Sequence, residues 1–355
     1  MHEHVSNRLT RIDALRGVAI LLVLAFHYYS AWSAILPYGE RFAAFPPFRM
    51  GLFGVYLFFM ISGFVILMTL ERSAGFVSFI MRRWIRLFPA MLAISLFIYF
   101  TAPLFPERPA GAPSTLDLIP GLLFIEPSWL IFWTGLDMRS LELAFWSLYA
   151  EVRFYILFAA LYFALGQKVA VRMLLILSLT GLALRIAGWV LPLPMAATSA
   201  IELANDIFNL TNLPWFLVGI LSYQLWKTGE LPQWRRADML YYGAIVLPAL
   251  VSERRKLPFV ACILAAFLIG VFSKKGAFLF GNRALLWLGA ASYPLYLVHE
   301  RLGLAIIIKA SRAIPELPDI LLPLVASACV MFLAFGVARW VEAPAQAFLR
   351  RRLSN

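Results

Sequence analysis

The sequence predicts an all-α membrane protein, a polytopic bundle of about ten transmembrane helices, and two observations support this prediction. Hydrophobic residues make up 62% of the 355 residues and charged residues only 14%, whereas an average soluble domain has roughly 25% charged residues. Apolar runs of about 20 residues, long enough to cross a bilayer as a helix, also recur along the chain. With 31 basic and 19 acidic residues, the chain has too little charge to cover a soluble exterior. Soluble enzymes, disordered chains and disulfide-rich secreted scaffolds fit this composition poorly.

The apolar runs give ten candidate spans within a single membrane domain, residues 8–345. Two of them, 238–251 and 259–272, are short and would have to tilt, kink or extend at their ends. A basic cytoplasmic tail, 346–355, is expected to follow, with no soluble catalytic module at either end. The ten predicted spans are 15–36, 50–70, 84–102, 142–165, 172–191, 211–226, 238–251, 259–272, 284–308 and 319–341.

The segment between the third and fourth spans, residues 103–141, is rich in proline. Its apolar pieces are too short to cross a membrane. We expect it to be an outer loop with a re-entrant or surface-lying part. Its first five prolines are Pro103, Pro106, Pro109, Pro113 and Pro120.

The lysines and arginines predict the orientation of the chain. With the N-terminus inside, the inner loops collect about twice as many basic residues as the outer loops, so we expect both termini on the cytoplasmic side of the inner membrane. The net charge of +12 fits this bias and an attraction to anionic membrane lipids. The aromatic residues lie in apolar runs, so nucleic-acid binding is not expected. Cys262 and Cys329 also lie in apolar runs without metal-ligand spacing, so no metal site is expected.

Charged side chains inside predicted spans are costly and usually mark function. His27 lies in the first span, and Arg16 precedes it by eleven residues, close to three helical turns. Both side chains therefore point to roughly one face, about 16 Å apart along the axis. This pair suggests an anionic ligand that enters from the cytoplasm. The alternative is that Arg16 is a basic anchor and His27 a hydrogen-bonded packing residue.

The third span opens with three arginines, Arg82, Arg83 and Arg86. Arg83 and Arg86 are one turn apart on the same face of the helix. Guanidinium groups suit bidentate capture of phosphate oxygens, so the cluster is a candidate phosphate site. The alternative is a basic anchor at the inner headgroups, although three arginines in five residues exceed what anchoring needs.

Glu151 lies well inside the fourth predicted span, so it must be paired, protonated or facing water. Counted along the two helices, its depth nearly matches that of His27 in a hydrocarbon core of about 30 Å. Glu151 is therefore a candidate partner for His27. The alternative is a structural pair between Glu151 and Arg153 or Arg185.

In the ninth predicted span, His299 and Glu300 follow Pro294, which should kink the helix. We expect His299 in the outer half of the membrane. The alternative for Glu300 is a structural pair with Arg301 or with a base of an outer loop.

Two further signals are weaker. The small residues Ser62 and Gly63 in the second span would allow a close approach of another helix. Glu342 and Pro344 end the last span, where a cap or an ion pair with Arg339 is expected.

Taken in order, these elements resemble the motifs of the membrane-bound acyltransferase-3 family. The resemblance extends from about residue 8 to about residue 345, and six motifs in sequence carry it. They are Arg16 with His27, Phe58-Phe-Met-Ile-Ser-Gly-Phe64, Arg82-Arg-Trp-Ile-Arg-Leu-Phe-Pro89, Trp146-Ser147-Leu-Tyr-Ala-Glu151, Ser292-Tyr293-Pro-Leu-Tyr296-Leu-Val-His299, and Glu342-Ala-Pro344.

The resemblance implies that an acyl group, commonly acetyl from acetyl-coenzyme A, is moved onto a sugar hydroxyl. The implied acceptor is a surface glycan such as lipopolysaccharide or peptidoglycan, a glycolipid or lipid-linked oligosaccharide, or a small glycoside. Arg153 beside the glutamate and the long 103–141 loop depart from many relatives. A fused extracytoplasmic hydrolase-like domain, present in some relatives, is not expected here.

Roles follow for each matched residue. Arg16, Arg82, Arg83 and Arg86 would hold the phosphates of the coenzyme. His27 would act as a base on the acceptor hydroxyl or carry the acyl group itself, and Glu151 would orient His27 or stabilise its cation. The residues expected to support the substrate or the site are Ser147, Tyr293, Tyr296, His299 and Glu342.

Two other classes of protein remain open from the residues. A proton-coupled or acyl-group transporter would also have many spans with buried charges and a helix-breaking proline, but no inverted repeat is visible. A membrane scaffold or sensor would leave the Arg16–His27 spacing and the arginine cluster unexplained.

Overall fold

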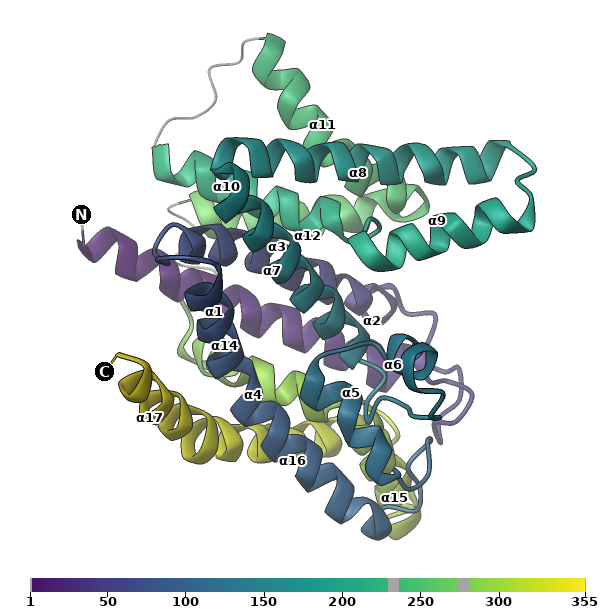
Figure 1. Ribbon diagram of the computed structural model, residues 1–355. Helices are drawn as coiled ribbons and strands as arrows, with labels where there is room; N and C mark the ends of the chain where they lie inside the picture. The colour runs from purple at the N-terminus through teal and green to yellow at the C-terminus, as the bar shows by residue number, and fades with distance from the viewer. Residues whose placement is uncertain (1, 229–235, 274–280, 355) are drawn as a thin grey trace. The chain divides into compact units, whose positions relative to one another are not determined.

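The computed structural model describes residues 2–228, 236–273 and 281–354, and every regular element in these ranges is a helix (Figure 1). The chain forms two compact units, and each is assembled from three separate segments. Unit 1 comprises Met1–Leu15, Val55–Met81 and Ala150–Gly281. Unit 2 comprises Arg16–Gly54, Arg82–Tyr149 and Asn282–Asn355. The long helices α1 (His2–Phe26), α4 (Phe76–Thr101) and α7 (Phe145–Leu165) contribute residues to both units.

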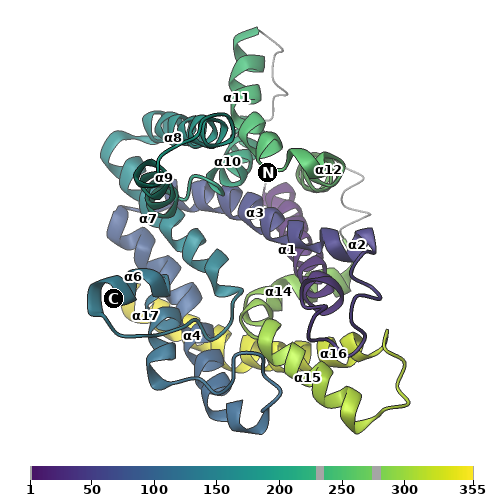
Figure 2. The same cartoon turned by 90° about the vertical axis from the view of Figure 1, so that its right-hand side faces the viewer.

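Unit 1 contains most of the chain's middle third. Helix α9 turns back along α8, and both lie side by side in the two views (Figures 1 and 2). The helices α8, α10 and α11 pack against one another. Its other elements are α3 (Phe53–Leu70), α8 (Gln167–Val190), α9 (Met195–Phe208), α10 (Leu213–Thr228), α11 (Arg236–Ser252), η5 (Arg254–Lys256) and α12 (Leu257–Phe272).

Helices α3 and α10 approach closely through two glycines. A Cβ atom on Gly63 would lie 2.0 Å from the carbonyl oxygen of Phe216, and a Cβ atom on Gly219 would lie 1.9 Å from that of Met60. No side chain fits at such distances, so only glycine lets the two backbones touch here. The close helix approach predicted from Ser62 and Gly63 is confirmed.

Unit 2 contains the C-terminal helices and the proline-rich segment. Helix α16 packs against both α14 and α15 (Figure 2). The predicted C-terminal tail lies largely within a further helix, α17. The elements are η1 (His27–Ala31), α2 (Pro46–Arg49), η2 (Met50–Leu52), η3 (Ala102–Leu104), η4 (Thr115–Asp117), α5 (Leu118–Leu123), α6 (Pro127–Thr134), α14 (Arg283–Val298), α15 (Glu300–Ala313), α16 (Leu322–Val337), η6 (Ala338–Glu342) and α17 (Ala343–Ser354).

Two glycines bring the first span against the late helices of unit 2. A Cβ atom on Gly17 would lie 2.3 Å from the carbonyl oxygen of Leu285 in α14. A Cβ atom on Gly303 in α15 would lie 1.9 Å from the hydroxyl of Tyr28 in η1. At Gly17 the neighbour is backbone, so a residue without a side chain is required, whereas at Gly303 a Cβ atom would displace the Tyr28 side chain. The first contact places the first span beside the start of α14, and the second places the end of that span beside the start of α15.

Among the described residues, seven helices are long and apolar enough to cross a membrane, or eight if one bent pair is a single span. The predicted number of about ten is not confirmed. Helices α10 and α11 form where spans were predicted, but they have only 16 and 17 residues. The predicted span 284–308 is interrupted, because α14 ends at Val298 and α15 begins at Glu300. Helix α14 continues through Pro294, so the break falls at His299 and not at the proline.

The proline-rich segment, predicted as an outer loop with a re-entrant or surface-lying part, folds into several short helices. Two apolar pieces, Thr115–Leu123 and Pro127–Thr134, meet at an angle of 115°, as in a broken span or a re-entrant loop. Helix α6 ends at Thr134 and is followed by Gly135, whose positive φ of 69° is the left-handed conformation that favours glycine. The chain then continues without helix until α7 begins at Phe145.

Candidate active site

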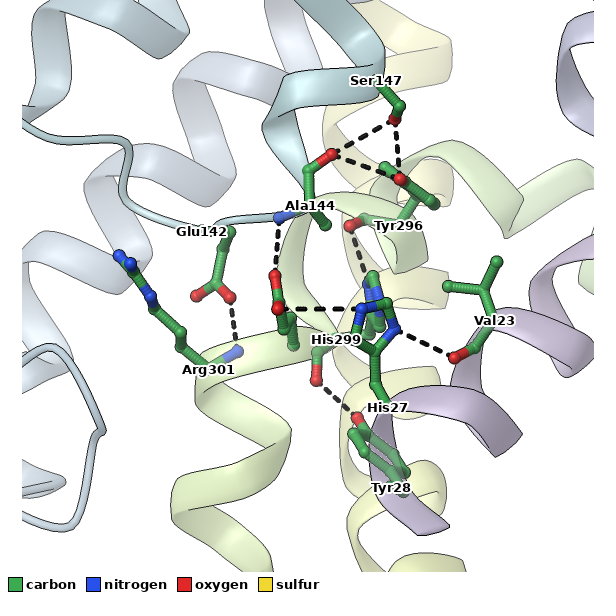
Figure 3. A network of polar contacts seen from close by, with 10 residues as sticks. Val23, His27, Tyr28, Glu142, Ala144, Ser147, Tyr296, His299 and Arg301 are labelled. Carbon is green, nitrogen blue, oxygen red and sulfur yellow. Dashed lines mark hydrogen bonds and ion pairs between the residues drawn. The ribbon is translucent and has the colours of Figure 1, made fainter. Parts of the chain in front are cut away.

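His27 lies where the first span changes its helical geometry. Helix α1 ends at Phe26, and His27 is the first residue of the π-helical turn η1. Such turns are rare and frequently mark functional sites. The side chain of His27 is 13% exposed, and its Nδ1 atom lies 3.0 Å from the carbonyl oxygen of Val23 (Figure 3).

The carboxylate that lies against His27 is that of Glu300. Its Oε1 atom lies 3.7 Å from Nε2 of His27, and the side chain is almost fully buried. Its Oε2 atom accepts a hydrogen bond from the backbone N–H of Ala144. Glu300 is the first residue of α15, so the break between α14 and α15 places this carboxylate. The sequence pointed to Glu300 only as a charge inside a predicted span, next to His299.

His299 lies on the other side of the His27 ring and is fully buried. Its Nε2 atom is 3.2 Å from Nδ1 of His27, and its own Nδ1 is 2.8 Å from the carbonyl oxygen of Tyr296 (Figure 3). The two rings meet edge to face, with centroids 4.9 Å apart.

These contacts fix the tautomers of both rings. A carbonyl oxygen can only accept, so the proton of His299 is on Nδ1 and its Nε2 is an acceptor. By the same argument, His27 carries its proton on Nδ1, shared between the carbonyl of Val23 and Nε2 of His299. The lone pair of His27 is therefore on Nε2, the nitrogen that faces Glu300.

Hydroxyl groups surround this histidine pair. The hydroxyl of Tyr28 donates to the carbonyl of His299 at 2.6 Å. The hydroxyls of Ser147 and Tyr296 lie 2.7 Å apart, and both contact the carbonyl oxygen of Ala144 at 3.2 Å (Figure 3). The structure thus brings together Ser147, Tyr296 and His299, which the sequence motifs singled out separately.

A second layer of charged groups lies behind Glu300. The carboxylate of Glu142 is fully buried and 3.1 Å from the guanidinium of Arg108. It also accepts a hydrogen bond from the backbone N–H of Arg301 (Figure 3). Burial raises the pKa of the Glu142 carboxyl above its ordinary value, while Arg108 opposes the rise. Neither Arg108 nor Glu142 belongs to a recognisable motif, so a role for them could not be predicted from the sequence.

Glu151, the predicted partner of His27, has other partners in unit 1. Its carboxylate accepts hydrogen bonds from the hydroxyls of Ser62 and Tyr155. The structural alternative, a pair with Arg153 or Arg185, is not what forms either. Arg153 donates to the carbonyl of Asp206 at 2.7 Å, and Arg185 to the hydroxyl of Thr211 at 2.9 Å.

The four predicted donor-site arginines all belong to unit 2. Arg82 is exposed, Arg16 and Arg86 are half-buried, and Arg83 is only 7% exposed. The cluster therefore combines an exposed and a buried guanidinium within one turn of α4.

The remaining predicted support residues lie near this arginine cluster. The hydroxyl of Tyr293 donates to the carbonyl of Leu87, next to Arg86, at 2.9 Å. Glu342 accepts a hydrogen bond from Gln346 at 2.9 Å, and Arg86 is its charged neighbour. The amide of Gln346 also donates to the carbonyl of Arg86 at 3.2 Å. Glu342 thus hydrogen bonds with Gln346 and has Arg86 as a charged neighbour, and the expected ion pair with Arg339 is not among its contacts with the described residues.

Comparison with known proteins gives a family match over almost the whole chain. The sequence pattern of the acyltransferase-3 family, described as an acyltransferase domain, matches residues 9–341. No solved structure matches the chain.

Individual relatives are more distant. Over 323 residues the chain is 27% identical to the peptidoglycan O-acetyltransferase OatA of Listeria monocytogenes, covering 81% of this chain and 48% of that protein. It is 25% identical over 323 residues to YrhL of Bacillus subtilis, covering 81% of this chain and 47% of that protein. It is 35% identical over 88 residues to an O-acetyl transferase of the Shigella phage Sf6, covering 25% of each chain. The chain spans about half the length of OatA and YrhL.

Proposed function

Because the chain belongs to the acyltransferase-3 family, we propose that it is a membrane O-acyltransferase that moves an acetyl group from acetyl-coenzyme A to a sugar hydroxyl of a cell-surface or lipid-linked glycan. The single observation that carries this proposal is the pair formed by His27 and Glu300. The free lone pair of Nε2 and a buried carboxylate 3.7 Å away are the parts that an acyl transfer to a hydroxyl needs.

In the proposed reaction, His27 moves a single proton from the acceptor to the leaving group. Nε2 takes the proton of the acceptor hydroxyl while the hydroxyl oxygen forms a bond with the thioester carbonyl carbon. The carbon–sulfur bond then breaks, and the imidazolium returns the proton to the thiolate, which leaves as free coenzyme thiol. Glu300 stabilises the imidazolium between the two steps. In the two-step alternative, Nε2 attacks the thioester carbonyl carbon, the carbon–sulfur bond breaks, and the coenzyme leaves as thiolate. The acyl group then passes from Nε2 to the acceptor hydroxyl, whose proton neutralises the thiolate.

His299 keeps His27 in the reactive tautomer. Its Nε2 can only accept, so it holds the proton of His27 on Nδ1 and leaves Nε2 free. The buried surroundings also limit the access of water, which would otherwise hydrolyse the thioester.

The donor side of the proposal rests on the arginines of unit 2. Arg16, Arg82, Arg83 and Arg86 supply positive charge to bind the phosphates of the coenzyme. The acceptor is proposed to be a glycan because OatA and the Sf6 protein are both named as O-acetyl transferases, and OatA as one of peptidoglycan. We place the protein in the inner membrane, in contact with anionic lipids, because of its apolar helices and its basic bias.

A thiol-release assay tests the proposal. The purified full chain in detergent is given acetyl-coenzyme A with and without a peptidoglycan or polysaccharide acceptor, and free thiol and acetylated glycan are measured. The wild-type chain should release thiol faster with acceptor, and His27→Ala should lose at least about 100-fold of that rate because the base is gone. A transporter or a scaffold would release no acceptor-dependent thiol, and normal turnover by folded His27→Ala protein would refute the role of His27.

A further inference from the structure

Three charged residues behind the proposed catalytic pair take no part in the reaction described above. Arg108, Glu142 and Arg301 are all buried, and the Glu142 side chain is fully enclosed. Burying ions is costly unless each charge is paired and hydrogen-bonded. The cost of burying these charges directly beside Glu300 therefore indicates that they have a role.

Glu142 closes the N-terminal end of α15. The first N–H groups of a helix lack partners inside the helix and need acceptors from elsewhere. His299, at the N-cap position of α15, makes no capping hydrogen bond with its side chain. Instead, the carboxylate of Glu142 accepts from the N–H of Arg301. Glu142, which is distant in the sequence, thus fixes the first turn of α15, and this turn begins with Glu300.

The two arginines fix the segment that leads to Ala144. The guanidinium of Arg301 donates to the carbonyls of Ser140 and Leu141 at 2.6 and 3.0 Å. The guanidinium of Arg108 donates to the same Leu141 carbonyl and, at 3.1 Å, to the carboxylate of Glu142. The residues just before Ala144 are therefore held from two sides.

These contacts converge on the position of the Glu300 carboxylate. It is held by its own backbone at the start of α15 and by the N–H of Ala144. The contact between Glu142 and the N–H of Arg301 fixes the start of α15. The guanidinium groups of Arg108 and Arg301 fix the segment that carries the N–H of Ala144. A shift of either element would change the separation of Glu300 from His27, which is 3.7 Å.

We propose that Arg108 and Glu142 are positioning residues for the transfer reaction, which hold Glu300 at its working distance from His27. This inference rests on the proposed function. It also gives the proline-rich segment a task, because Arg108 and the carbonyls of Ser140 and Leu141, all in that segment, belong to this buried layer.

The test is a steady-state analysis of Glu142→Gln in the full chain. Both carboxylate oxygens of Glu142 accept from hydrogen-bond donors, the guanidinium of Arg108 and the N–H of Arg301. In Glu142→Gln, the amide NH₂ group is itself a donor and would face one of these two donors. We expect kcat to fall by up to about 100-fold, the cost of a small misplacement in an active site. The KM for acetyl-coenzyme A should stay within about two-fold, and the pH profile of kcat should shift because His27 loses its fixed carboxylate partner.

A matched control and a second variant accompany the test. Arg139 lies in the same segment before Ala144 and forms an ion pair with Asp117 at 3.5 Å, but its side chain is 55% exposed. Arg139→Met should therefore keep normal kcat and a normal pH profile. The double variant Arg108→Met, Glu142→Gln removes both charges of the Arg108–Glu142 ion pair together, so that neither is left without the other. It should show the same loss of kcat, and it decides the question if the single variant does not fold.

The outcomes separate the inference from the proposed function. If Glu142→Gln, or the double variant in its place, melts at a lower temperature but keeps normal kcat and pH profile per folded molecule, the layer is only structural and the inference is wrong. If the wild-type chain shows no acceptor-dependent thiol release, the proposed function itself fails.

Discussion

At the scale of single residues, the proton of His27 decides what the ring can do. A histidine with its proton on Nε2 would present a donor to Glu300 and could not take a proton from a substrate there. The contacts with Val23 and His299 hold the proton on Nδ1 instead. The Glu300 carboxylate then faces the lone pair on Nε2 of His27. Carboxylate and ring attract each other most strongly when Nε2 has taken up a proton and the ring is an imidazolium. That proton is the one that an acyl transfer has to move.

This arrangement predicts a difference between two glutamate variants. Glu300→Gln keeps the shape but removes the charge that stabilises the imidazolium, so kcat should fall by about 10²- to 10⁴-fold with a shifted pH profile. Glu151→Gln alters a group held by Ser62 and Tyr155, so the pH profile of its remaining activity should match the wild type. Both variants are assayed for kcat from pH 5 to 9. A shifted profile in Glu151→Gln with a normal one in Glu300→Gln would return the role to Glu151.

At the scale of the elements, the site depends on two departures from regular helix. The π-helical turn begins at His27, and the break between α14 and α15 falls at His299. Each irregularity lies at one of the two histidines. The carbonyl of His299 accepts from Tyr28, the second residue of the π turn, so the two departures hold each other in place.

The first turns of α4 carry a second prediction at this scale. Arg83→Ala and Arg86→Ala should each weaken binding of acetyl-coenzyme A, and salt should weaken binding to the wild type, because phosphate contacts are screened by ions. Lysine at either position should restore only part of the affinity, since it lacks the bidentate fork. Arg351 is an exposed basic residue of α17. The control variant Arg351→Ala should therefore bind acetyl-coenzyme A with normal affinity. Calorimetry that shows unchanged affinity in both α4 variants would identify the cluster as a headgroup anchor.

At the scale of the whole molecule, hydrophobic patterning predicted the helices well and their pairing poorly. Apolar runs located α3, α7 and α8 to within a few residues, because burial in lipid or in the bundle requires them. The motifs also pointed to Ser147 and His299, which lie together in unit 2. Family motifs can do this because they record residues that act together.

The partner of His27 could not be predicted in the same way. Counting residues along a helix gives depth in a membrane, but it says nothing about which neighbour faces which. Glu151 matched His27 in predicted depth, whereas Glu300 is the carboxylate beside it. The Arg108–Glu142 pair depends on how an irregular loop packs, and no periodicity in the sequence encodes that.

The number of membrane crossings decides whether the two termini lie on the same side of the membrane. Seven spans would put the two ends of the chain on opposite sides of the membrane, whereas eight or ten would put them on the same side. Among the described residues, seven helices are long and apolar enough to cross a membrane, the pair bent at 115° is so only if it forms one span, and α11 contains a shorter apolar stretch, Leu240–Ser252. The basic residues favour an even number, with both ends in the cytoplasm.

Cysteine labelling tests this orientation directly. In a chain whose own cysteines are replaced by Cys262→Ala and Cys329→Ala, a single cysteine is introduced by Ser6→Cys, Ser354→Cys or Ser114→Cys. A membrane-impermeant maleimide should label Ser114→Cys in intact cells, because the proline-rich segment is expected outside. It should label the two terminal variants only after the membrane is permeabilised. If the two terminal variants label from opposite sides, the number of crossings is odd, and one of the short or bent helices does not span the membrane.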